Sequence, residues 1–268
     1  MPLREAVSHA RRQLAAAGCE TPRLDAELLL AAALRVGRER LVIDGDRPLT
    51  PAQAQRFAAL LERRRAREPV AYVLGRRAFR HLTLVVDRRV LIPRPETELL
   101  VEVGLRLAPG SRVVDVGTGS GAVALALKDE RPDLAVRGTD ISAAALAVAR
   151  DNASRLNLDV TFTHADLLDG APCEAVVANL PYVPQDAALP PEISRYEPSQ
   201  ALFAGVDGLS LVRRLVTTAA AEPISLIALE ISPEQAGEVT RLVSGAGFGS
   251  VIVHRDLGGR ERVVVGFR

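Results

Sequence analysis

The chain has 268 residues, of which 48% are hydrophobic and 25% are charged, and its formal net charge is +1. This balance is that of an ordinary globular protein with a full hydrophobic core. No apolar run approaches the roughly 18 residues of a membrane-spanning helix, and the N-terminus lacks the pattern of a signal peptide. Cys19, Cys173 and the four scattered histidines fit no disulfide or metal-site spacing. We therefore expect a protein of the reduced cytoplasm without a bound metal.

The small net charge conceals an asymmetry. Residues 1–92 contain 18 arginines and 10 acidic residues, a balance of +8, whereas residues 93–268 have a balance of −7. The arginines are densest at residues 63–67 and 76–80. They fit either a solvated helix face or a docking surface for an acidic partner or nucleic acid.

Residues 1 to about 70 predict a small helical bundle. Leucines and alanines recur at helical spacing between residues 24 and 33. Thr21-Pro22 and Thr50-Pro51 are each typical of a helix N-cap followed by proline at the first helical position. Between residues 73 and 92, alternating apolar positions indicate short strands. We therefore expect a helical domain over residues 1–72 and a β-hairpin linker over residues 73–92.

From residue 93 onward, helix and strand patterns alternate. After a helix that runs to about residue 107, strands are expected at residues 112–116, 135–139, 160–163, 175–178, 225–230, 250–254 and 262–267. Helices between the first five fit the crossovers of a mostly parallel sheet covered on both faces. The last two strands are too close for a crossover and predict an antiparallel hairpin. Residues 93–268 thus match the seven-stranded, doubly wound α/β fold of class I methyltransferases.

A glycine-rich turn follows the first of these strands. Glycines there let the backbone approach a ligand closely, but Gly117 and Gly119 also satisfy a loose dinucleotide fingerprint, and a tight turn without a ligand fits as well. Asp140 lies 21 residues beyond Gly119, where a ribose-binding carboxylate is expected. A ribose is common to NAD and to S-adenosylmethionine, so Asp140 does not separate the two.

Three other features favour S-adenosylmethionine. Asp115 precedes the first glycine, where a carboxylate can steer the cationic amino-acid end of this ligand. Asp166 and Leu167 follow the third strand and are placed for the adenine amino group and ring. Asn179-Leu180-Pro181-Tyr182 ends the fourth strand, at the sheet edge where open α/β folds bind ligands. This tetrapeptide suits a planar nitrogen, which reacts only when its N–H groups are held and its lone pair meets an electrophile such as a sulfonium methyl.

Over nearly its full length, the chain resembles the peptide chain release factor N5-glutamine methyltransferases. Residues 67–75 resemble the family's linker, residues 90–98 match its most specific signature, and residues 196–209 resemble the segment after its catalytic tetrapeptide. The resemblance implies an enzyme that moves the methyl of S-adenosyl-L-methionine to the glutamine of a Gly-Gly-Gln motif in release factors, leaving S-adenosyl-L-homocysteine. We expect a monomer whose helical domain, residues 1–72, docks this protein substrate.

The resemblance also implies roles for single residues. The Asn179 side-chain oxygen and the Leu180 carbonyl would accept the two amide N–H bonds of the glutamine. Pro181 follows these two residues in the segment that holds the side chain, and Tyr182 would pack on the amide plane. No strong general base is required, because the nitrogen can lose its proton once it is positively charged. Arg94 and Glu96 fit either substrate contact or a structural ion pair. Cofactor contacts are expected at Asp115, Gly117, Thr118, Gly119, Ser120, Gly121, Asp140, Asp166, Leu167 and Asn179.

Leu180 departs from the family's pattern, which usually has proline there. Its carbonyl can still accept a hydrogen bond, but the φ restriction of proline is lost, so we expect a looser loop and lower activity. Asn-Leu-Pro-Tyr is also typical of ribosomal RNA adenine dimethyltransferases, which makes an adenine N6-methyltransferase acting on ribosomal RNA or DNA the main alternative. The aromatic content of 3% offers few stacking platforms for bases, which favours a protein substrate. A third alternative is a module that binds cofactor and partner without catalysing a reaction, and only the altered residue at position 180 supports it.

Overall fold

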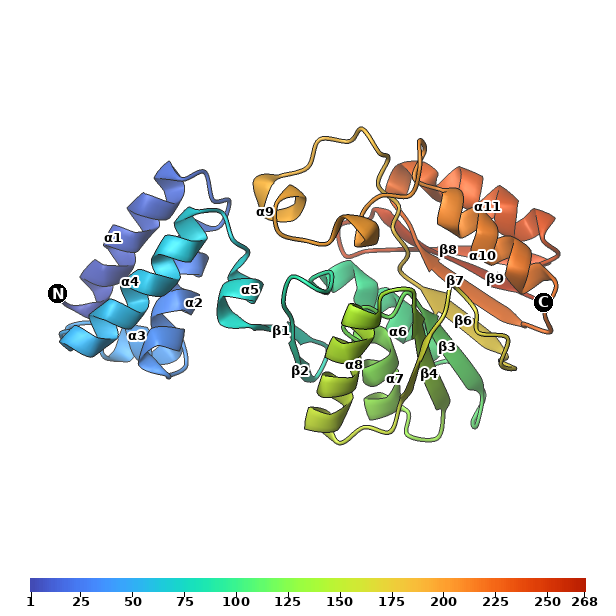
Figure 1. Ribbon diagram of the computed structural model, residues 1–268, viewed down its shortest axis with the longest axis horizontal. Helices are drawn as coiled ribbons and strands as arrows, with labels where there is room; N and C mark the ends of the chain where they lie inside the picture. Colours follow the sequence, from blue (N-terminus) through green and yellow to red (C-terminus); the bar gives the residue numbers. More distant parts are fainter. The chain divides into compact units, whose positions relative to one another are not determined.

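The computed structural model describes residues 1–268, and the chain forms two compact units. Unit 1 comprises Met1–Arg76 and Leu189–Tyr196, and unit 2 comprises Arg77–Ala188 and Glu197–Arg268. In Figure 1, the sheet of unit 2 and its helices run from green to red. The chain therefore passes from one unit to the other three times.

Unit 1 is a helical bundle, as the sequence pattern predicts. Thr50 caps α4 through a reciprocal capping box with Gln53, and Pro51 occupies the first helical position. The interior is filled by leucines, alanines and Phe57, so the apolar faces of the helices are buried against one another. The helices are α1 (Leu3–Ala16), α2 (Pro22–Leu34), α3 (Glu39–Ile43), α4 (Pro51–Arg65), α5 (Val70–Leu74) and α9 (Pro191–Ser194).

The α9 segment joins unit 1 through ion pairs. The Glu192 carboxylate accepts hydrogen bonds from Arg64 at 3.0 Å and from Arg67 at 2.5 Å, and Arg64 also donates to Asp25 at 2.7 Å. The Tyr196 hydroxyl donates to the Ala66 carbonyl at 2.8 Å. We expected this stretch within the domain of residues 93–268. In the structure it clusters with unit 1. Periodicity cannot indicate which distant arginines a short loop helix will meet.

Unit 2 contains the seven-stranded sheet that the sequence predicts. The strand order is β5-β4-β3-β6-β7-β9-β8, with parallel pairing from β5 to β7 and antiparallel pairing of β9 with β7 and β8. The predicted C-terminal hairpin is therefore confirmed. The order reverses at β3 and β6, which places a ligand-binding crevice at their carboxyl ends. The strands are β3 (Arg112–Val116), β4 (Ala135–Asp140), β5 (Thr161–His164), β6 (Ala175–Ala178), β7 (Leu226–Glu230), β8 (Ser250–Arg255) and β9 (Glu261–Phe267).

Helices cover both faces of this sheet (Figure 1). On one face, α6 (Glu98–Gly104), α7 (Ala122–Glu130) and α8 (Ala143–Leu156) pack in one core cluster; on the other, α10 (Ser210–Ala220) and α11 (Ala236–Gly245) pack in a second. Neighbouring strand residues such as Val113 and Val114 belong to different clusters, because successive side chains point to opposite faces. Helix α6 ends before the expected residue 107, since tighter turns follow Gly104.

The predicted hairpin linker is a two-stranded sheet formed by β1 (Arg76–Phe79) and β2 (Leu82–Val85). Asn152 on α8 is 1% exposed and holds β2 in place. Its side-chain oxygen accepts a hydrogen bond from Val85 N at 2.7 Å, and its Nδ2 donates to the Val85 and Ser120 carbonyls at 3.0 and 2.9 Å. One amide thus connects β2 to the glycine-rich turn. No helix in the structure is long and apolar enough to span a membrane.

Candidate active site

A cavity of about 330 Å³ lies in unit 2 at the carboxyl ends of its central strands. Residues from the ends of β3, β4 and β6 and from the loop after β5 form its walls, which is where a doubly wound sheet binds its ligand. Asn179, Leu180 and Pro181 of the tetrapeptide meet here with two glycines of the turn and with Asp140 and Asp166. Tyr182 and Asp115 are not among the lining residues. Among the lining residues are Gly117, Gly119, Asp140, Asp166, Leu167, Asn179, Leu180, Pro181, Gln200, Phe203 and Arg214.

The glycine-rich turn is fixed by its own backbone. Gly117 has φ 72° and Gly119 has φ 55°, a left-handed conformation that glycine adopts without strain. The backbone N–H groups of Gly117 and Thr118 both donate to the Thr139 carbonyl at 2.9 Å. A Cβ on Gly117 would lie 3.1 Å from a Leu180 methyl. Glycine is therefore favoured at this position by its conformation, and a side chain there would also press on Leu180.

Asp140 ends β4 beside the glycine-rich turn. It lines the cavity, and its oxygens accept hydrogen bonds from Gly119 N at 2.9 Å and from Ser142 N at 2.8 Å. Each oxygen keeps lone-pair capacity for a further donor. Burial raises the pKa of this carboxyl, while the two backbone N–H groups and His164 lower it. Asp140 thus ties the glycine turn to β4 and can still bind hydroxyl groups.

Asp115 differs from the expectation. It is 2% exposed and does not line the cavity. Its carboxylate accepts hydrogen bonds from the Thr118 hydroxyl at 2.6 Å and from Ala124 N at 3.2 Å. Burial raises its pKa to about 6. The structure therefore gives Asp115 the role of holding the turn and the start of α7, and direct steering of a cationic ligand stays a prediction.

The remaining residues of the glycine turn support it rather than line the cavity. Thr118 and Ser120 are buried, the former bonded to Asp115 and the latter to Asn152 through its carbonyl. A Cβ on Gly121, which has φ 82°, would lie 3.0 Å from Leu125. None of these three residues lines the cavity, so their contacts with the cofactor stay predictions.

Asp166 and Leu167 form the wall next to β5. The Asp166 carboxylate pairs with Arg214 of α10 at 2.7 Å. Leu167 has φ 71°, an uncommon conformation for a residue with a branched side chain, and its carbonyl accepts the Thr139 hydroxyl at 2.6 Å. Strained residues of this kind cluster at functional sites, and here the strain places the leucine side chain at the cavity.

Asn179 faces the cavity from the end of β6. Its Nδ2 donates to the Thr97 hydroxyl at 3.0 Å, and its side-chain oxygen has no donor within the chain. The Leu180 carbonyl has no donor within the chain either. Two acceptor oxygens on adjacent residues are therefore available beside the cavity, and together they match the two N–H bonds of a primary amide or amino group.

The Leu180 side chain is anchored in the core beside the loop, and lower activity through the loss of proline stays a prediction. Its side chain is 5% exposed and packs in the core cluster that contains Leu209 and Val212. It also lies against the glycine turn, within 3.1 Å of a Cβ built on Gly117. The buried side chain thus restrains the backbone by packing, in place of the φ restriction of proline.

Tyr182 follows Pro181 and is held through its backbone. Gln235 Nε2 donates to the Tyr182 carbonyl at 3.0 Å and to the Asp207 carbonyl at 3.3 Å. Gly208, with φ 73°, packs so closely that a Cβ there would lie 2.1 Å from the Tyr182 carbonyl oxygen. Burial, followed by the nearby Glu230 charge, raises the pKa of the Tyr182 hydroxyl to about 12. Tyr182 is therefore a neutral, fixed aromatic ring at physiological pH.

Arg94 and Glu96 do not form the structural pair that we considered. Arg94 instead pairs with Glu197 at 2.5 Å, and the other oxygen of Glu197, which is 6% exposed, accepts Ile92 N at 3.2 Å. This pair ties the residue 90–98 segment to the loop beyond the tetrapeptide, although the two are a hundred residues apart in sequence. Sequence periodicity cannot identify an ion-pair partner at that separation.

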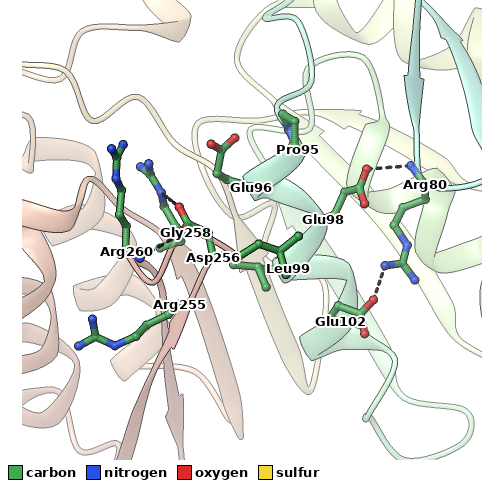
Figure 2. Close-up of a pocket in the computed structure, with 12 residues that line it drawn as sticks. Arg80, Pro95, Glu96, Glu98, Leu99, Glu102, Arg255, Asp256, Gly258 and Arg260 are labelled. Atoms are coloured by element: carbon green, nitrogen blue, oxygen red, sulfur yellow. Dashed lines mark hydrogen bonds and ion pairs between the residues drawn. The ribbon is translucent and has the colours of Figure 1, made fainter.

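Glu96 lines a second cleft of unit 2, about 560 Å³ in volume. Figure 2 shows Glu96 and Glu98 on its wall from α6 and the turn before it, with Arg255 and Arg260 of the β8–β9 hairpin opposite. Glu98 accepts a hydrogen bond from Arg80 N at 3.2 Å. Glu96 and Arg262 of this cleft both contribute to the electrostatic field at Tyr182. The cleft is thus charged, with both signs present.

Several residues of the site were missed by the sequence reasoning. Thr97 orients Asn179, Gln235 holds Tyr182, and Glu230 is a buried carboxylate beside Thr97 with its Oε2 accepting no hydrogen bond. Arg214 and Phe203 complete the cavity wall. Thr97 lies within the family's signature and Glu230 ends a predicted strand, so both carried a positional signal. No cluster of His, Cys, Asp or Glu in the structure could hold a metal ion, and both cysteines are buried and free.

Two sequence-family descriptions match the chain: "PrmC N-terminal domain" over residues 5–75 and "Methyltransferase small domain" over residues 95–192. The release factor glutamine methyltransferase of Moorella thermoacetica is 43% identical over 281 residues, which cover 100% of this chain and 99% of that protein. The Deinococcus radiodurans protein of the same name is 40% identical over 273 residues, 98% of each chain.

A solved structure of a 16S ribosomal RNA methyltransferase from T. thermophilus, in complex with AdoMet and guanosine, has a TM-score of 0.53. It is 18% identical and covers 72% of this chain and 49% of that one, a likeness that shows the fold alone. The two full-length relatives show more, because identity of 40% or above extends over both units. By this measure, the chain belongs to the release factor glutamine methyltransferase family.

Proposed function

We propose that this protein transfers a methyl group from S-adenosyl-L-methionine to the side-chain amide nitrogen of the glutamine in the Gly-Gly-Gln motif of peptide chain release factors. S-adenosyl-L-homocysteine is the other product. The observation that carries the proposal is the pair of available acceptors, the Asn179 side-chain oxygen and the Leu180 carbonyl, beside the cavity. The membership of the family, established over both units, supports the same substrate.

The cavity residues fit S-adenosylmethionine. Asp140 has lone-pair capacity for ribose hydroxyls, and the left-handed glycines 117 and 119 leave room for a ligand next to the backbone. Leu167 supplies an apolar wall for the adenine ring, and Asp166 supplies an acceptor for its amino group. When bound, this cofactor supplies an electrophilic methyl group.

The protein's contribution to the reaction is positioning. Amide nitrogen is a weak nucleophile because its lone pair is delocalised into the carbonyl. Two acceptors that hold both N–H bonds fix the amide plane and concentrate electron density on the nitrogen. Tyr182, neutral and fixed by Gln235, offers a ring against which that plane can pack. The nitrogen sheds its proton after it becomes cationic, so no side chain needs to act as a strong base.

Asn179→Ala tests the assignment. Purified protein is incubated with labelled S-adenosylmethionine and either a release factor or ribosomal RNA, and mass spectrometry locates the methyl group. We expect methyl transfer to the release factor glutamine in wild type and none in the variant, whose affinity for S-adenosylmethionine falls at most moderately. Full activity of Asn179→Ala would falsify the assignment. A methyl group on RNA adenine would replace the proposed substrate by the nucleic-acid alternative.

We further propose that unit 1 docks the release factor. The arginines at residues 63–67, for which a docking surface was one of two alternatives, are poorly suited to the task, because Arg64 is 5% exposed and Arg63 is bonded to Glu68. A groove of about 830 Å³ on unit 1 suits it better, since it exposes Val42 and Ile43 beside Arg11. Reversing the charge at Arg11 should raise KM with kcat unchanged; an unaltered KM would contradict docking there. We also propose, as expected from the sequence, that the protein is a monomer and acts in the reduced cytoplasm.

A further inference from the structure

Three polar side chains form a line from the cavity to the end of β7. Asn179 lines the cavity and donates from its Nδ2 to the Thr97 hydroxyl at 3.0 Å. The Thr97 side chain neighbours the Glu230 carboxyl and lowers its pKa. Thr97 is 4% exposed and Glu230 is 2% exposed. The two inner groups are therefore shielded from water, and only Asn179 reaches the cavity.

The direction of the hydrogen bonds along this line decides which Asn179 atom faces the cavity. A hydroxyl has one proton to donate, and an ionised carboxylate can only accept. When the Thr97 proton points to Glu230, the Thr97 oxygen is left to accept an N–H bond from Asn179. The side-chain oxygen of Asn179 is then turned away from Thr97.

We propose that Thr97 and Glu230 are positioning residues that hold the Asn179 amide with its oxygen directed at the glutamine nitrogen. This inference rests on the proposed function, because it takes the Asn179 oxygen as an acceptor for the substrate amide. It adds two residues that touch neither substrate nor cofactor. Without them, the Asn179 amide can rotate by half a turn and present a donor where the reaction needs an acceptor.

The burial of Glu230 is hard to explain by stability. Its Oε2 accepts no hydrogen bond, and a buried acceptor without a partner costs stability. Burial, followed by the Glu96 charge, raises the pKa of Glu230 to about 7, against the lowering effects of Thr97, Arg262 and Arg94. Tyr182 interacts with the same carboxyl. Costly polar groups of this kind persist where function needs them.

Protonation of Glu230 is expected to reverse the direction of these hydrogen bonds. A protonated carboxyl can donate to the Thr97 oxygen, which frees the Thr97 proton to donate to the Asn179 oxygen. The amide is then stabilised in the rotated orientation, with its N–H groups toward the cavity. Methyl transfer should therefore fall as the pH drops through the pKa of Glu230, and the loss should be in kcat more than in S-adenosylmethionine binding.

The test compares Thr97→Val, Thr97→Ser and Glu230→Gln with wild type in single-turnover methylation of a release factor between pH 5.5 and 9. Thr97→Val keeps the shape but removes the hydroxyl, and should lower the rate roughly 10- to 100-fold, the effect of one buried hydrogen bond. Thr97→Ser should restore most of the rate. Glu230→Gln should keep substantial activity and lose the acidic fall of the pH profile, because its carbonyl oxygen accepts from Thr97 at every pH. Calorimetric binding of S-adenosylmethionine serves as the folding control.

A second readout needs no substrate and separates this inference from the proposed function. In protein labelled with ¹⁵N, the Asn179 side-chain amide protons should show a nuclear Overhauser effect to Thr97 above pH 7 that weakens on acidification, and it should stay constant in Glu230→Gln. A wild-type enzyme that leaves release factors unmethylated would sink the proposed function while this signal still decides the orientation. Wild-type rates in Thr97→Val, no rescue by serine, or an unchanged acidic limb in Glu230→Gln would each overturn the positioning role.

Discussion

The close approach of Gly208 to Tyr182 gives the sharpest prediction. Gly208→Ala places a methyl group 2.1 Å from the Tyr182 carbonyl oxygen, and an ordinary contact of 3.4 Å requires a displacement of about 1.3 Å. The carbonyl cannot move freely, because it accepts a hydrogen bond from Gln235 at 3.0 Å. The substitution should therefore shift the tetrapeptide that the reaction depends on.

Gly205→Ala, in the same loop, provides the matched control. Gly205 has φ 79° and Gly208 has φ 73°, so alanine pays a left-handed conformational cost of about 1–2 kcal/mol at either position. A Cβ on Gly205 meets only Ser210, at 3.4 Å. The difference between the two variants therefore isolates the contact with Tyr182.

We expect Gly208→Ala to be less stable than Gly205→Ala by about 1 kcal/mol, the net value of the strained hydrogen bond. Its methylation rate should be about 100-fold lower, as expected when a positioning group is displaced by about 1 Å. Urea unfolding and single-turnover methylation measure the two effects. Equal rates in the two variants would show that the Tyr182 carbonyl is not held as rigidly as the structure indicates.

Three other changes have defined outcomes. Asp140→Ala should weaken S-adenosylmethionine binding at least about 10-fold by calorimetry, because Gly119 and Ser142 N–H groups lose their acceptor as well; unchanged affinity would contradict its ribose role. Arg64→Ala should cost about 3–5 kcal/mol in urea unfolding, since it leaves a buried carboxylate unpaired, whereas exposed Arg65→Ala should cost less than about 1 kcal/mol. Glu230→Gln should be more stable than wild type at pH 8 by up to about 3 kcal/mol. The pKa of Glu230 is raised from 4.5 to about 7 in the folded protein, so the wild type loses stability as the pH rises between those values. The advantage should shrink as the pH falls toward 4.5, and an advantage independent of pH would refute the titration of Glu230.

Local sequence patterns predicted most of the fold. The structure contains the expected seven strands, the antiparallel C-terminal hairpin and the helical N-terminal region. They were predictable because burial on both faces and short connections produce a recognisable sequence periodicity. The pattern of strand ends also predicted the cavity, since carboxyl ends of parallel strands meet at one edge. The same pattern predicts that Gly117, Asp140 and Asn179 lie at this edge, and all three line the cavity.

Partners distant in sequence could not be predicted. Arg94 meets Glu197, Glu192 meets Arg64, and Thr97 connects Asn179 with Glu230, all across loops whose paths periodicity does not encode. The burial of a polar group could not be predicted either: sequence spacing indicated a ligand contact for Asp115, and the structure adds hydrogen bonds by which it supports the turn.

The sheet, the cavity at its carboxyl edge and the residues at the strand ends were thus predictable from local spacing alone. The orientation of those residues depends on contacts that form only in the folded chain. The direction of the Asn179 amide, the restraint on Leu180 and the immobility of Tyr182 follow from side chains that are far apart in the chain, and the directionality of hydrogen bonds and the volume of packed atoms act only once those side chains are in contact.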